Sequence, residues 1–359
     1  MNKFSSTPIY KNNVEAFGNL QQEIEFNSLE PKWNKSRALL IDLNSDDVAR
    51  LEKAFKRYNR FRNIPGEDEE VVICTIAQIL AEELDKYSAK IASALNRARN
   101  GEADILYICG LPVSKELSIL IVLTFSYRLG YPMNYSIGGK RSLIDVKFSN
   151  TPRSEYKRKS RPPRYRKQRA RDFYSLFATF PRECRPEWSL SLGVANTAQT
   201  TIGYIPFLDV FDSMSIENRK ALSRKRLYFP VPLGYGFDKV SYISHGPTLR
   251  VSSKGAFEVM IPHTLSDFHE LEKFSLADPM RELKSLASRK IRTFAMKPGA
   301  LLIVNNYRGL HTNPQIMGKN YMVLRTYVRT SLHTLRYISE SAGPVFDPKS
   351  ILKTHIIRD

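Results

Sequence analysis

The stretch that decides the fold reads Phe294-Ala-Met-Lys-Pro-Gly-Ala-Leu-Leu-Ile-Val-Asn-Asn-Tyr-Arg-Gly-Leu-His311, and a polar loop joins it to Tyr321-Met-Val-Leu-Arg-Thr-Tyr-Val-Arg329. Pro298-Gly299 is a turn signal. Residues 300–304 form a short apolar run rich in β-branched side chains, which predicts a buried strand. A second strand is expected to begin near Tyr321. The stretch therefore predicts two strands, with His311 presented in a loop after the first.

The second of these strands carries cations on one face. Residues two apart on a strand point the same way, so Arg325, Tyr327 and Arg329 share a face. An imidazole can bind a metal ion, and a guanidinium can hold a carboxylate with two parallel hydrogen bonds. The sequence therefore predicts a site in which His311 and one or two arginines face a common space.

This stretch resembles the C-terminal motif of the Fe(II)/2-oxoglutarate oxygenases, in the branch related to taurine dioxygenase and clavaminate synthase. The resemblance rests on Pro298-Gly299, Asn306, Arg308, His311 and Arg325, in that order, although Asn305 stands where the family usually has Asp. It implies that His311 is the last iron ligand. It also implies that Arg325 binds the distal carboxylate of 2-oxoglutarate, with Arg329 as the other candidate.

Two upstream blocks extend the resemblance to residues 104–329. Residues 104–113 end in Gly-Leu-Pro-Val, and residues 188–210 contain two expected strands. By resemblance, Thr201 lies near 2-oxoglutarate, while Arg250 and Arg308 contact the substrate. The implied fold class is mainly β with flanking helices (α+β), built on a double-stranded β-helix or jelly-roll of the clavaminate synthase-like type.

One element of the family pattern is missing. The family needs His-x-Asp/Glu upstream, which here should lie just before Phe180-Pro181. Residues 174–180 read Tyr-Ser-Leu-Phe-Ala-Thr-Phe instead and contain neither a histidine nor an acid. A single imidazole does not hold Fe(II) usefully, because affinity depends on several ligands in a fixed geometry. His311 is thus the one surviving ligand, Fe(II) is doubtful, and 2-oxoglutarate remains possible.

The charge is strongly basic. Among 359 residues the formal net charge is +19, which predicts acidic partners or substrates. Residues 153–171 concentrate this charge and read as a mobile loop. It is expected to be an active-site lid or to contact nucleic acid or an acidic carrier protein. The candidate contact residues are Lys157, Arg158, Arg164, Arg166, Lys167 and Arg169.

The remaining features of the sequence predict how the chain is divided into regions and which helices it contains. We expect an irregular extension over 1–35, one domain over 36–333 that begins with helices over 36–100, and a C-terminal tail over 334–359. Helices are expected from Ser45, over 71–98, over 117–129 and over 278–288. No apolar run is long enough to span a membrane. The three cysteines have no metal-binding or paired spacing, so a cytoplasmic protein with free thiols is expected.

Three functions remain open. The first is an oxygenase-fold protein with altered or metal-independent chemistry on an anionic or amino-acid-like substrate. This follows the resemblance to amino-acid hydroxylases and desaturases. The second is a catalytically inactive pseudo-oxygenase whose basic loop binds nucleic acid or an acidic partner protein. The third is an ordinary Fe(II)/2-oxoglutarate oxygenase whose first ligands come from elsewhere in the chain.

Overall fold

The computed structural model describes residues 37–62, 68–114, 116–137, 142–149, 173–196, 200–224, 226–231, 242–251, 257–261, 273–312, 321–353 and 356–357. All of them belong to one compact unit, residues 37–359. The expected extension over 1–35 and the basic segment over 153–171 lie outside the described residues.

A large mixed sheet forms the centre of this unit. Its described strands run in the order β1-β2-β13-β6-β15-β3-β16, and β4 also pairs with β15. β1 pairs with β2, and β16 with β3, in parallel, while the other pairs are antiparallel. The strand bounds are β1 (Ala38–Asp42), β2 (Ile105–Cys109), β3 (Tyr131–Tyr135), β4 (Asp145–Ser149), β6 (Trp188–Asn196), β13 (Leu301–Asn305), β15 (Tyr321–Arg329) and β16 (Val345–Phe346).

A smaller antiparallel sheet runs in the order β12-β7-β14-β5. Its strands are β5 (Phe173–Tyr174), β7 (Thr201–Pro206), β12 (Arg292–Ala295) and β14 (Gly309–Thr312). Two further small sheets contain β8 (Arg226–Pro230), β9 (Tyr242–Pro247), β10 (Leu249–Val251), β11 (Phe257–Val259) and β17 (Ile356–Ile357).

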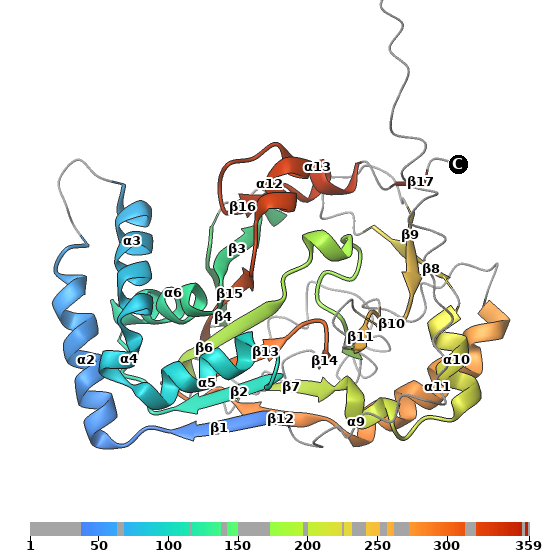
Figure 1. Ribbon diagram of the computed structural model, residues 1–359, viewed down its shortest axis with the longest axis horizontal. Helices are drawn as coiled ribbons and strands as arrows, with labels where there is room; N and C mark the ends of the chain where they lie inside the picture. Colours follow the sequence, from blue (N-terminus) through green and yellow to red (C-terminus); the bar gives the residue numbers. More distant parts are fainter. Residues whose placement is uncertain are drawn as a thin grey trace, which may run out of the picture. The chain divides into compact units, whose positions relative to one another are not determined.

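Helices flank the large sheet. The described helices are α2 (Ser45–Asn59), α3 (Glu69–Glu82), α4 (Leu84–Tyr87), α5 (Ala89–Arg99), α6 (Leu117–Leu129), α9 (Phe207–Phe211), α10 (Ile216–Arg224), α11 (Lys273–Arg289), α12 (His333–Ser339), α13 (Pro348–Leu352) and the 3₁₀ helix η3 (Arg182–Cys184). Figure 1 shows α2 to α6 gathered beside the large sheet, and their apolar side chains share one core with Leu190, Ile303, Leu324 and Val328 of its strands. We call this the helix-side core. No helix in the described ranges has both the length and the apolar character that a membrane crossing requires.

Strand alternation gives the large sheet a second apolar face. Its side chains there share a core with those of the smaller sheet, so the two sheets pack face to face. We call this the inter-sheet core. It contains Ile105, Leu302, Val304, Tyr321 and Val323 from the large sheet and Ile202, Tyr204, Phe294 and Met296 from or beside the smaller one.

The observed elements confirm a β-rich fold with flanking helices and correct two details. The expected helix over 117–129 has the same bounds as α6. The helix expected over 71–98 is three helices. The first break is at Glu83, which ends α3; the second is at Ser88, which is extended and whose hydroxyl accepts a hydrogen bond from the Ile91 amide at the start of α5. The C-terminal region, expected as a tail, contains α12, β16 and α13, and Phe346 is fully buried.

Gly193 provides a test of the close approach between the sheets. A Cβ built there would lie 2.3 Å from the Lys297 carbonyl oxygen and 2.6 Å from that of Met296. Since backbone atoms cannot swing aside as a side chain can, Gly193→Ala should lower the free energy of unfolding by about 3 kcal/mol, the upper end of typical overpacking costs.

The measurement is urea unfolding followed by circular dichroism. Gly343→Ala is the matched control, because the nearest atoms to a Cβ there are 4.0 Å away. Equal stability of the two variants would contradict the described packing.

Candidate functional site

His311 lies in strand β14, not in the loop where the sequence places it. In the sheet it stands opposite Tyr204 of β7 and Tyr174 of β5. Paired residues project to the same face, and Tyr204 belongs to the inter-sheet core, so His311 also faces the large sheet. The side chain is buried, with 4% exposed. His311 is therefore buried between the two sheets from a strand position.

The imidazole of His311 is held on three sides. Its Nε2 lies 2.8 Å from Oδ1 of Asn306, an oxygen that accepts, so Nε2–H donates this hydrogen bond. The ring of Tyr204 meets it edge-on at 5.5 Å between centroids, and the ring of Tyr174 lies at 6.4 Å. The nitrogen expected to face iron is thus hydrogen-bonded to Asn306.

The segment where the resemblance places His-x-Asp/Glu lies beside His311. Tyr174 is the strand partner of His311, and Leu176, two residues later, is buried in an aromatic cluster. In that cluster Phe180 stacks on Tyr135 at 4.3 Å, and Phe177 meets Tyr327 edge-on at 5.0 Å. Neither side chain at positions 174 and 176 is a good Fe(II) ligand.

Other potential ligands do not complete a metal site within the described residues. No group of three or more His, Cys, Asp or Glu side chains there is arranged to hold a metal ion. Cys184 is fully buried near the segment, and burial raises the pKa of its thiol to about 12, so it stays protonated. The described donors around His311 therefore do not fit a 2-His-1-carboxylate iron centre.

Arg325 is a buried cation on the inner face of β15. Its side chain is 6% exposed, and its Nε donates to Ser191 Oγ at 3.2 Å across the β6–β15 ladder. No carboxylate among the described residues makes an ion pair with it. Asp145, its strand partner on β4, instead accepts a hydrogen bond from the Asn134 side chain at 3.0 Å.

Tyrosines surround this guanidinium. Burial by itself lowers the pKa of Arg325, but the oxygens of Tyr327 and Tyr174 outweigh it and raise the pKa above its usual value. Burial raises the pKa of Tyr174, so its hydroxyl remains a neutral donor. The hydroxyl of Tyr321, on the same strand face, is buried and makes no hydrogen bond. A cation and tyrosine hydroxyls thus lie close together on this face of β15, and these groups suit a carboxylate.

Two other arginines that the sequence singles out make hydrogen bonds within the protein. Arg308 donates to the Gly101 carbonyl and to buried Asp104, both at 3.1 Å. Arg329 donates to the carbonyl oxygens of Arg182 and Arg185 and contacts the Tyr307 hydroxyl at 3.0 Å. These contacts favour Arg325 over Arg329 as a carboxylate anchor.

The structure does not bring Thr201 into the space between the sheets. Ile202 and Tyr204 point into the inter-sheet core, so Thr201 projects to the opposite face of β7. Gly203, on that same outer face, abuts Thr312. Arg250 lies on β10 and is partly exposed. The nucleic-acid candidates Lys157, Arg158, Arg164, Arg166, Lys167 and Arg169 lie outside the described residues.

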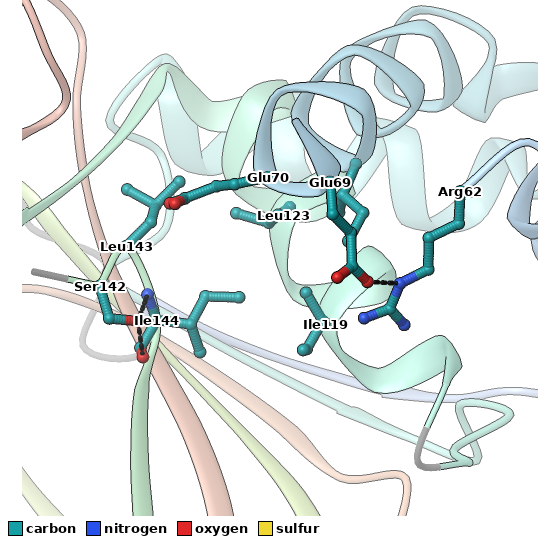
Figure 2. A pocket seen from close by; sticks show the side chains of 9 residues that line it. Arg62, Glu69, Glu70, Ile119, Leu123, Ser142, Leu143 and Ile144 are labelled. Atoms are coloured by element: carbon teal, nitrogen blue, oxygen red, sulfur yellow. Dashed lines mark hydrogen bonds and ion pairs between the residues drawn. The ribbon is translucent and has the colours of Figure 1, made fainter. Parts of the chain in front are cut away.

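A pocket of about 200 Å³ lies on the helix side of the large sheet (Figure 2). Its one arginine, Arg62, is paired with Glu69, and several of its apolar residues belong to the helix-side core. The pocket is therefore separate from His311 and Arg325, which lie on the other side of the large sheet. The lining residues are Arg62, Glu69, Glu70, Ile73, Ile119, Leu123, Ser142, Leu143 and Ile144.

Comparison with solved structures shows that this fold is similar to the folds of several iron-dependent oxygenases. Asparagine oxygenase (AsnO) is 17% identical, with a TM-score of 0.67 over 87% of this chain and 99% of that one. Its complex with Fe(II), 2S,3S-3-hydroxyasparagine and succinate matches with a TM-score of 0.65 at 18% identity, over 86% of this chain and 98% of that one. The oxygenase OrfP with Fe and L-Arg is 14% identical, with a TM-score of 0.61 over 86% of this chain and 99% of that one.

At such low sequence identities, the likeness shows that the folds are similar. As far as the fold is concerned, it confirms the family resemblance inferred from the sequence. No protein-family model and no curated protein matches the chain significantly.

The contacts of Arg308 predict a structural role that a substrate-binding residue would not have. Arg308→Gln should lower the free energy of unfolding by about 1–3 kcal/mol, because buried Asp104 loses a charged hydrogen-bond partner. Urea unfolding measures the change. In Arg281→Gln, which breaks an exposed ion pair with Asp278, the change should stay within about 0.5 kcal/mol. An Arg308→Gln variant as stable as the parent would contradict this assignment.

Proposed function

We propose that this chain retains the acid-binding half of an oxygenase-type site and that Arg325 binds the carboxylate of a small anionic ligand. The observation that carries the proposal is a buried guanidinium without a carboxylate partner among the described residues. A buried charge without a counter-ion is costly, so a ligand carboxylate would stabilise it. The unpaired hydroxyl of Tyr321 adds hydrogen-bonding capacity.

The ligand we propose is 2-oxoglutarate or an amino-acid-like acid. The solved structures of similar fold include an asparagine oxygenase with succinate and OrfP with L-Arg, which supports this class of ligand. The packing of two sheets face to face supports a double-stranded β-helix as the frame of the site. Arg250 stays a proposed contact for the anionic substrate. Thr201, Arg308 and Arg329 are less suited, because of the face or the contacts described above.

We further propose that the iron centre is degenerate. Residues 174–180, where the resemblance places the missing ligands, contain neither a histidine nor an acid, and Asn306 is hydrogen-bonded to Nε2 of His311. On this proposal the chemistry is altered or independent of metal, and the chain need not activate oxygen. An ordinary iron oxygenase would need a histidine and an acid from residues outside those described.

A second proposal concerns the basic segment over 153–171. Its lysines and arginines, interleaved with tyrosines, suit contact with nucleic acid or an acidic protein. In that case the oxygenase fold is a scaffold and the segment is the binding surface. The net charge of +19 favours such a partner but does not identify it.

The acid-binding proposal predicts the effect of changing Arg325. Arg325→Gln should abolish calorimetric binding of 2-oxoglutarate and succinate. Arg325→Lys, which keeps the charge but loses the planar pair of donors, should weaken it at least tenfold, since each charged hydrogen bond contributes about 1.5–3 kcal/mol.

Two controls separate this site from general charge. Arg281→Gln removes one exposed cation, and Arg164→Ala combined with Arg166→Ala removes two cations from the basic segment. Both should bind the acids as the parent does. If the Arg325 variants also bind like the parent, the pocket assignment is wrong.

A further inference from the structure

Arg185 is a second buried arginine, and it lies outside the site described above. It follows the 3₁₀ helix η3, and its side chain is 3% exposed. Its guanidinium lies over the ring of Tyr307 at 5.3 Å from the centroid. Its carbonyl oxygen accepts hydrogen bonds from the Tyr307 hydroxyl and from Arg329. The backbone around Arg185 is thus fixed, and the side chain is enclosed.

One whole edge of this guanidinium lacks hydrogen-bond partners. Both Nε and Nη2 are buried and make no hydrogen bond. These two nitrogens direct their N–H bonds to the same side, and this fork matches two oxygens of a carboxylate or phosphate group. Buried donors are almost always paired, so an unpaired pair on one edge points to a missing acceptor.

Nearby carboxylates are already engaged. Glu258 accepts two hydrogen bonds from Arg182, at 2.6 and 2.5 Å. Glu187 accepts hydrogen bonds from the Thr330 amide at 3.1 Å and hydroxyl at 2.7 Å, and it lies 3.7 Å from Arg329 Nη2. No described carboxylate forms an ion pair with Arg185.

The local electrostatics favour an anion. Burial lowers the pKa of the Arg185 guanidinium, the Glu258 carboxylate raises it, and the nearby cation of Arg250 lowers it again. Among the described residues, the four cations of this cluster lie near three carboxylates; the cations are Arg182, Arg185, Arg250 and Arg329, and the carboxylates are Glu183, Glu187 and Glu258. An added oxoanion would offset both the excess positive charge and the unpaired donors.

We propose that the Nε–Nη2 edge of Arg185 binds the oxoanion group of a small ligand, a carboxylate or a phosphate, with Arg250 strengthening the attraction. The proposal rests on the contacts of Arg185 alone and not on the function proposed for Arg325. Arg185 packs on Tyr307, and the chain neighbour of Tyr307, Asn306, is hydrogen-bonded to His311.

The test is calorimetric titration of the full-length chain with inorganic phosphate and, separately, with acetate, at ionic strength matched with chloride. The parent should bind one or both probes, and preference between them distinguishes a phosphate from a carboxylate ligand. Arg185→Lys keeps the charge but loses the fork, so binding should weaken at least tenfold. Arg250→Gln should also weaken binding, whereas Arg281→Gln should leave it unchanged.

Arg325→Gln separates the two proposals. It should leave a probe bound at Arg185 in place while removing the dicarboxylate bound at Arg325. If Arg185→Lys fails to fold, Arg250→Gln decides, and unchanged binding in that variant overturns the proposal. A parent that binds neither probe beyond the chloride control, or equal binding in the parent and Arg185→Lys, overturns it as well.

Discussion

Strand β15 sets the chemistry of this molecule because its side chains alternate between two different environments. Leu324 and Val328 enter the helix-side core, while Arg325 and Tyr327 point to the opposite face. A shift of the strand by one residue would exchange these sets and bury the arginine among leucines. Burial of the apolar set thus fixes the register, and the register holds a cation in the interior.

The same alternation bears on the expectations from the sequence. Within β15 it puts Arg325, Tyr327 and Arg329 on one face. It also puts Thr201 on the outer face of β7, because Ile202 and Tyr204 occupy the inner face. The family resemblance alone does not reveal this orientation, since it aligns positions along the chain and not the faces of the sheet.

Other outcomes depend on contacts that sequence spacing does not encode. From its position in the sequence, Arg308 resembles a substrate-binding residue. In the structure it donates a hydrogen bond to Asp104, which is distant in the chain. Arg185 carries no motif, and the only signal that singles it out is the unpaired edge of its buried guanidinium. By contrast, the sequence alone shows that residues 174–180 contain neither a histidine nor an acid, and β5 brings that segment beside His311.

The central claim is that an acid-binding arginine persists beside an incomplete iron site, and anaerobic titration with Fe(II) in the presence of 2-oxoglutarate tests it most directly. Chelated 2-oxoglutarate gives a weak visible charge-transfer band with Fe(II). The account predicts that the acid binds equally with and without Fe(II) and that no such band develops. A band that appears in the parent and is lost in His311→Ala would contradict it, because that result requires a working metal centre built on His311.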